Sequence, residues 1–173
     1  MMLINHQIPP HMQACRDVQK ETFAALMDLY ENNYLRLKKL IPELPQINTP
    51  VKSSVIGCFD LYLTVHEQSK FTTQLSLSYS FKRNNDVVRE PDLQIRVYHD
   101  VGLVEVLSGE LHHGRLTLKN LPETAILERW HLNRFLYKWL GFCLHIGHSF
   151  DGSECPENIN LRINQILSEK ISS

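Results

Sequence analysis

The spacing of the hydrophobic residues changes twice along the chain, and this change constrains the fold more than any other feature. From about residue 11 to residue 41, apolar residues recur in steps of three and four, which indicates an amphipathic helix. Between residues 59 and 108 they alternate with polar residues, which is typical of strands with one face toward water. From about residue 122 to residue 147 the helical steps return. The chain is therefore predicted to run helix, sheet, helix.

The first helix is expected from residue 11 to residue 41, either continuous or broken near Asn32 and Asn33. An irregular lead-in, residues 1–10, precedes it. Pro42 ends the helix, because proline lacks a backbone N–H and disfavours a helical conformation in the residue before it.

The alternating region predicts an antiparallel sheet of four to five strands. The segment 82–92 is rich in charged residues and is interpreted as a loop between the second and third strands. The expected strands span residues 59–66, 71–81, 93–99 and 102–108, with a short fifth strand near 115–119.

The last long helix carries a broad apolar stripe, and Gly147 is expected to end it. After a linker that begins at residue 150, isoleucine and leucine recur at helical spacing between residues 157 and 172. We interpret residues 11–149 as one domain and residues 150–173 as a linker and a short amphipathic tail helix. The tail is expected to pack on its own domain or on another subunit, which would make a homodimer.

Helices and strands that are segregated along the chain indicate an α+β fold. We expect the N-terminal and C-terminal helices to pack on one face of the antiparallel sheet. A chain of 173 residues is long enough for one such domain with its own core.

The composition argues against several classes of protein. Eighteen basic and nineteen acidic residues leave a net charge of −1, with no basic stripe of the kind that nucleic-acid-binding domains present. No apolar run is long enough to cross a membrane, and the N-terminus does not resemble a secretory signal. The four cysteines lack the spacing of a zinc site or a disulfide framework. A cytoplasmic protein with no metal or cofactor is expected, and neither nucleic acid nor membrane is expected as a partner.

The segment "IRVYHDVGLVEV" (residues 95–106) raises the sharpest question about function. If Asp100 and Val101 form a two-residue hairpin loop, paired residue numbers sum to 201, so Arg96 faces Glu105. Such a cross-strand pair stabilises a hairpin without any chemistry. The alternative is an acid-base or ligand-binding cluster of Tyr98, His99 and Asp100. Neighbouring residues on a strand point to opposite faces, which favours the structural interpretation.

Two further groups of residues are candidates. Asn133 is an unusual residue in an apolar helix, and if it is buried it needs hydrogen-bond partners, which a loop near Asp100 would supply. Cys143, His145 and His148 lie close together in sequence, but their spacing does not converge on a metal, and the histidines are interpreted as solvated residues at the helix end.

Three segments resemble the YqiB-like family of small proteobacterial proteins, which carry a domain of unknown function. They read Y-E-N-N-Y-x-x-L-K-K-L-I-P (30–42), R-V-Y-H-D-x-x-L-V-E-V (96–106) and L-N-R-F-L-Y-K-W-L-x-x-C-L-x-x-G (132–147). The resemblance spans about residues 12–149. It implies a bacterial, cytosolic protein and supplies no catalytic residues to carry over.

The sequence therefore favours a non-enzymatic domain that binds a protein partner, through the open sheet face or the hairpin near residues 98–100. A small enzyme or a ligand-sensing domain remains the alternative, and no residue is assigned a catalytic role. The candidate binding residues are Arg96, Tyr98, His99, Asp100, Glu105 and Asn133.

Overall fold

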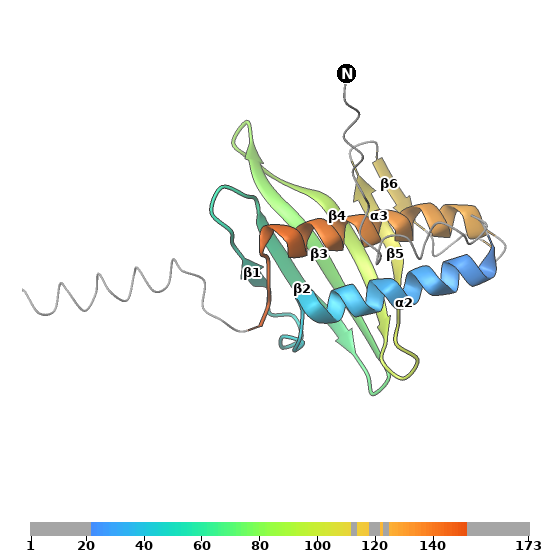
Figure 1. The fold of residues 1–173 in the computed structure, drawn as a ribbon. Coiled ribbons are helices and arrows are strands. Elements are labelled where there is room, and N and C mark those ends of the chain that lie inside the picture. Colours follow the sequence, from blue (N-terminus) through green and yellow to red (C-terminus); the bar gives the residue numbers. More distant parts are fainter. Residues whose placement is uncertain (1–21, 112–113, 118–121, 123–124, 152–173) are drawn as a thin grey trace, which may run out of the picture.

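The computed structural model describes residues 22–111, 114–117, 122 and 125–151. In this part of the chain, two helices lie side by side on one face of an antiparallel sheet (Figure 1). The predicted α+β class, with helices from both ends of the domain on one sheet face, is confirmed. None of the described helices is long and apolar enough to span a membrane.

The sheet is a simple meander in which every strand pairs with its neighbours in sequence, in the order β1-β2-β3-β4-β5-β6. One of these strands, β1, was not predicted. The elements are α2 (Phe23–Leu40), β1 (Val51–Ser53), β2 (Asp60–Gln68), β3 (Thr72–Arg83), β4 (Asp86–Tyr98), β5 (Leu103–Leu111), β6 (Gly114–Thr117) and α3 (Ile126–Ile146).

Helix α2 starts at a side-chain cap and runs without a break to the predicted proline boundary. The Thr22 hydroxyl accepts a hydrogen bond from the Ala25 N–H at 3.1 Å, which satisfies one of the free donors of the first turn. The helix continues through Asn32 and Asn33, so the alternative of a break there is wrong. The predicted start at residue 11 lies outside the described residues.

The predicted loop at residues 82–92 is wrong, because β3 and β4 continue through it as a long hairpin. Their last pair is Arg83 and Asp86, and Asn84 and Asn85 form the two-residue turn with φ of 51° and 69°. A positive φ at both turn residues matches the twist of paired strands, and asparagine tolerates it better than most residues. Charged side chains at the exposed end of a hairpin gave this segment the composition of a loop.

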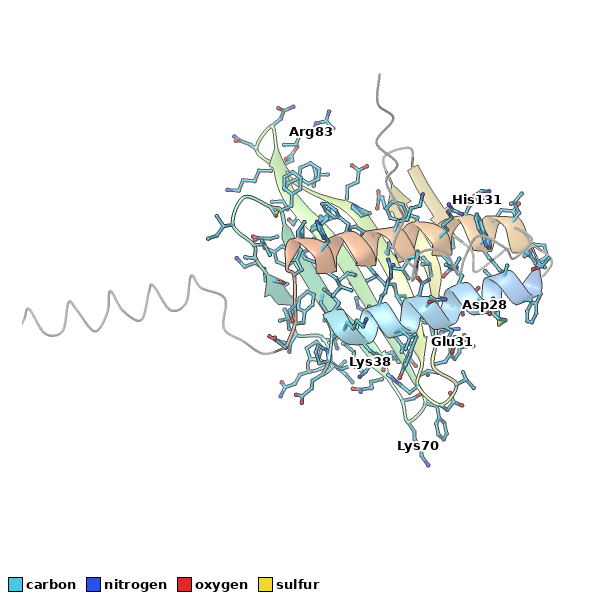
Figure 2. All side chains as sticks on the ribbon, viewed as in Figure 1. Asp28, Glu31, Lys38, Lys70, Arg83 and His131 are labelled. Carbon is cyan, nitrogen blue, oxygen red and sulfur yellow. The ribbon has the colours of Figure 1, made fainter. Side chains whose placement is uncertain are left out.

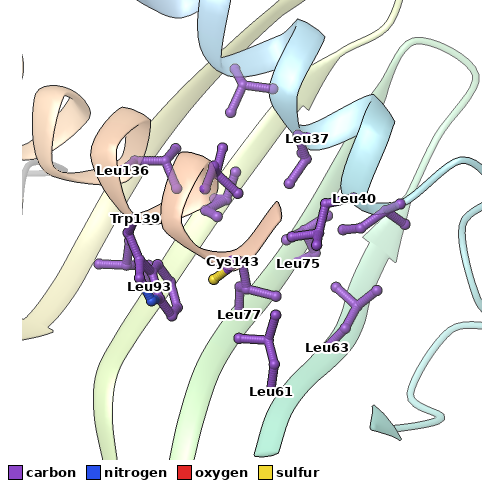
Figure 3. Close-up of a cluster of buried hydrophobic side chains, with 14 of the residues drawn as sticks. Leu37, Leu40, Leu61, Leu63, Leu75, Leu77, Leu93, Leu136, Trp139 and Cys143 are labelled. Carbon is purple, nitrogen blue, oxygen red and sulfur yellow. The ribbon is translucent and has the colours of Figure 1, made fainter. Parts of the chain in front are cut away.

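The core lies between the sheet and the two helices (Figure 3). Alternate residues of β2, β3, β4 and β5 point toward the helices and are buried, as the spacing in the sequence predicts. Gly109 of β5 lies at a close contact between the sheet and α3. A Cβ atom there would lie 2.6 Å from Leu93 Cδ2 and 3.2 Å from Leu132 Cδ1. A glycine at this point lets α3 approach the sheet.

Helix α3 ends as predicted at Gly147, which has a left-handed φ of 98°. The N–H groups of Gly147 and His148 donate to the Leu144 and Cys143 carbonyls, which is the pattern of a Schellman cap. Beyond the cap the chain stays on the domain. Phe150 is buried in the core, and its N–H donates to the Leu40 carbonyl at 2.8 Å.

Candidate functional site

The register of the β4–β5 hairpin is the one that the sequence predicts. The pairs include Arg96 with Glu105 and Tyr98 with Leu103, so the paired numbers sum to 201. Gly102 has a positive φ of 65° in the connecting turn, a conformation that a residue without Cβ adopts freely.

The hairpin residues do not gather on one face of the sheet. Arg96 and Tyr98 alternate with buried Val97 and therefore belong to the open face, by which we mean the face turned away from α2 and α3. His99 lies on the opposite side, where its Nε2 shares a hydrogen bond of 2.8 Å with the hydroxyl of buried Thr73. Asp100 is exposed at the turn. This division speaks against a Tyr-His-Asp acid-base cluster.

Glu105 is the residue on which several partners converge. The Tyr98 hydroxyl donates to its Oε1 at 2.6 Å, and the Tyr30 hydroxyl of α2 lies 3.5 Å from its Oε2. Arg129 of α3 forms an ion pair with the same Oε2 at 3.9 Å. The sequence predicted Arg96 as the charged neighbour of Glu105. The two residues are Cα partners, but the carboxylate contacts Tyr98, Tyr30 and Arg129.

Helix residues can reach Glu105 because it lies at a margin of the sheet. Strand β6 pairs with β5 only from Ser108 to Leu111, so Leu103–Leu107 has no described strand on that side. Helices α2 and α3 extend past β5 at their N-terminal ends (Figure 1). Tyr30 and Arg129 therefore reach the carboxylate around the edge of β5.

The two tyrosines of this cluster are held in their protonated form. Burial and, to a lesser extent, the nearby Glu105 carboxylate raise the pKa of Tyr30 to about 12, although Arg129 opposes both effects. Burial also raises the pKa of Tyr98, and its hydrogen bond to Glu105 acts in the same direction. Hydroxyls that keep their protons are good donors and poor bases. The geometry therefore fits a structural role, in which the Glu105 cluster joins the sheet to the helices, better than acid-base catalysis.

Asn133 is fully buried next to the Glu105 cluster and has hydrogen-bond partners on three elements, α2, α3 and β5. Its Oδ1 accepts from the Val106 N–H at 3.0 Å, and its Nδ2 donates to the Arg129 carbonyl at 2.8 Å. The Asn33 side chain of α2 donates to the Asn133 carbonyl at 3.2 Å. The prediction that a loop near Asp100 supplies the partner is wrong, because the Asn133 side chain is hydrogen-bonded to the backbone of β5 instead. Sequence reasoning noticed Asn33 only as a helix breaker and missed its role in joining α2 to α3.

The interpretation of His148 as a solvated helix-end residue is wrong. It follows the helix, is 2% exposed, and its Nδ1 shares a hydrogen bond of 3.0 Å with Ser53 Oγ of β1. Burial lowers its pKa, while Asp60 and the Phe59 backbone oppose the shift. Strand β1 was not predicted, so no sequence signal placed a partner beside this histidine.

Cys143 and His145 do not join His148 in a metal site. The buried Cys143 thiol lies 3.3 Å from the Tyr79 hydroxyl, and burial raises its pKa to about 11. His145 is exposed. Across the described residues, no group of three or more histidine, cysteine or acidic side chains is placed to hold a metal ion.

The open face of the sheet carries rows of polar side chains in register. Thr64, Ser76, Gln94 and Ser108 lie side by side on four successive strands. At one end of this face the Arg89 guanidinium lies 6.0 Å from the centre of the Tyr62 ring. Arg96 and Tyr98 occupy the other end. No described helix covers this polar face, whose ends carry Tyr62 with Arg89 and Tyr98 with Arg96 (Figure 1). Carboxylates lie in the same rows, since Asp92 and Glu110 are in register with Tyr62 and Glu105 pairs with Arg96.

A two-layer α+β domain with one sheet face open is the class of protein that these features define. Residues 36–149 match the family model described as a protein of unknown function, DUF1249, and the chain therefore belongs to the DUF1249 family. It is similar to the uncharacterized protein YqiB of Escherichia coli K12, with 26% identity over 128 residues, which cover 72% of this chain and 90% of that protein. The YqiB proteins of E. coli O6:H1 and O157:H7 match to the same extent. No solved structure matches significantly. The resemblance noted in the sequence is confirmed.

Proposed function

We propose that this chain is a non-enzymatic, cytosolic domain that binds a protein partner on the open face of its sheet. The observation that carries the proposal is the row of polar side chains between Tyr62 with Arg89 at one end and Arg96 with Tyr98 at the other. The free thiols of Cys58 and Cys143 agree with a reducing compartment.

Three of the four residues in this row are serine or threonine, and their short side chains let the backbone of a partner come close to the sheet. Tyrosine and arginine are the residue types on which binding energy is most often concentrated. Arg96 is the strongest candidate for a charged contact, because the Glu105 carboxylate across from it is engaged by Tyr98, Tyr30 and Arg129. The Arg96 guanidinium is hydrogen-bonded to the Tyr98 hydroxyl, and these two side chains together would meet an acidic group of the partner.

The size of the surface predicts a weak and reversible complex. Four strands and six residues along each strand span about 14 Å by about 20 Å, which gives a footprint of about 300 Å². A standard interface buries about 800 Å² on each partner, so the side chains at both ends must contribute to binding.

The proposal is tested by blocking the open face without touching the core. Gln94→Arg places a long charged side chain in the middle of the row, and Gln46→Arg makes the same change at an exposed position in the segment after α2. Both full-length variants and the wild type are used as bait in the lysate of the native host, after circular dichroism has shown that they are folded. A partner retained by wild type and Gln46→Arg and lost with Gln94→Arg supports the proposal. A partner retained equally by all three contradicts it.

A further inference from the structure

The β3–β4 hairpin extends beyond the two helices, and Figure 2 shows Arg83 at its tip, well away from both. On the helix-bearing face of the sheet, Tyr79 is the last residue that the helix layer covers, with Trp139 and His148 packed against its ring at 5.4 Å and 5.7 Å between centroids. The next row toward the tip is apolar, and its side chains are partly or largely exposed. We call it the overhang patch: Phe59, Phe81 and Val88.

The side chains of the overhang patch pack against one another. Phe81 and Val88 are Cα partners, and the Phe59 ring lies 5.1 Å from the Phe81 ring and 6.3 Å from the Tyr79 ring. Phe59 is nevertheless 57% exposed. A contiguous aromatic surface that continues the core marks a place where another apolar surface packs.

We propose that the C-terminal segment of the same molecule, residues 157–172, packs on the overhang patch. If the segment is a helix, one of its six apolar residues, Leu161, would lie on one side, and the other five would form one stripe on the other: Ile159, Ile163, Ile166, Leu167 and Ile171. A helix of this length is marginal in water unless its apolar stripe is covered. The overhang patch and the apolar stripe of the segment would therefore cover each other.

The chain leaves the described part close enough to reach the patch. The Ser149 N–H donates to Ser53 Oγ at 3.2 Å, and Ser53 is the Cα partner of Leu61, two residues from Phe59. Those two residues correspond to about 7 Å along the strand. Five residues, 152–156, span up to about 17 Å when extended, and sixteen residues of helix span about 24 Å. By contrast, the N-terminal residues join at Thr22, at the far end of α2 (Figure 1).

The test is hydrogen exchange followed by mass spectrometry on the full-length chain. In the wild type, we expect backbone amides of residues 157–172 to exchange about tenfold more slowly than in the undocked chain, which corresponds to a docked fraction of about 90%. Phe59→Ser should abolish this protection. Phe71→Ser is the matched control, because Phe71 is 50% exposed and lies at the β2–β3 turn, at the opposite end of the sheet.

A reciprocal pair of variants in the tail keeps the test independent of any effect of Phe59→Ser on folding. Ile163→Asp puts a charge on the stripe and should remove the protection, whereas Gln165→Asp puts the same charge on the opposite side and should not. An unprotected wild-type tail, or protection that survives both Phe59→Ser and Ile163→Asp, overturns the proposal. Protection that increases with protein concentration together with a dimeric mass also overturns it, because the occupant is then a second copy.

Discussion

The Asn133 side-chain oxygen accepts a hydrogen bond from the Val106 backbone N–H at 3.0 Å, so α3 caps a strand at the margin of the sheet. The unpaired backbone N–H and C=O groups of an edge strand can pair with a strand of another chain. In this domain a buried amide satisfies one of them, and Tyr30, Tyr98 and Arg129 gather on Glu105 nearby. The polar contacts of Asn133 and Glu105 thus join the sheet to the two helices.

Asn133→Leu should lower the free energy of unfolding by about 1–3 kcal/mol, because it leaves the buried Val106 N–H without an acceptor. Urea unfolding measures the change. Asn32→Leu is the matched control, since the Asn32 side chain bonds only locally, to the Asp28 carbonyl on the exposed side of α2. Equal stability of Asn133→Leu and wild type would contradict the role assigned to Asn133.

Tyr98→Phe should cost about 1–2 kcal/mol of unfolding free energy, because its hydroxyl donates to a carboxylate at 2.6 Å. Glu105→Gln should also destabilise the protein, since it weakens the acceptor of three groups. The two effects should not add, and the double variant should be more stable than their sum predicts. Additive effects in a double-mutant cycle would show that the two side chains act separately.

Gly109→Ala should destabilise the protein by about 1–3 kcal/mol, because the added methyl group meets Leu93 and Leu132 inside the core. Gly141→Ala is a useful comparison. The methyl group there would meet the end of the Arg36 side chain, whose displacement costs its hydrogen bond to the Tyr137 carbonyl but leaves the core unchanged. Thermal unfolding should therefore show a clearly larger decrease in Tm for Gly109→Ala than for Gly141→Ala. The reverse order would mean that the layers at Gly109 separate more easily than the structure indicates.

Stability should fall on acidification through His148. Its pKa is lowered in the folded state from 6.5, so below about pH 6.5 the unfolded chain binds a proton that the buried ring resists. The stability that His148 contributes is therefore present above pH 6.5 and is lost as the pH falls toward the folded pKa, by at most about 1.4 kcal/mol per pH unit. Urea unfolding at several pH values should show a shallower dependence for His148→Gln than for wild type. His145→Gln, at an exposed position, should leave it unchanged.

The sequence predicted those parts of the fold that depend on patterns among neighbouring residues. The period of two located β2 to β5. The pairing of Arg96 with Glu105 was predicted correctly, although the turn spans His99 to Gly102 and is longer than the two-residue loop expected from the sequence. Gly147 was recognised as a helix stop because its lack of a Cβ atom suits a left-handed residue. These features depend on neighbouring residues alone.

The predictions that failed depend on contacts between distant segments. Strand β1 has three residues, too few to show an alternation, and it brings Ser53 to His148. Tyr30 and Arg129 meet Glu105 across 75 and 24 residues of chain, and no local pattern specifies such a meeting. The rows on the open face likewise become visible only when the register of four strands is known.

The most direct test of the proposed function is to ask which face of the sheet touches the partner in the cell. A photo-activated crosslinking residue is placed at Ser76, in the middle of the open face, and in a second protein at Leu35, which is 54% exposed on α2. We predict that a specific protein is crosslinked from position 76, that Gln94→Arg removes this product, and that position 35 does not yield it. Capture of the partner from position 35 and not from position 76 would contradict the assignment of binding to the open face.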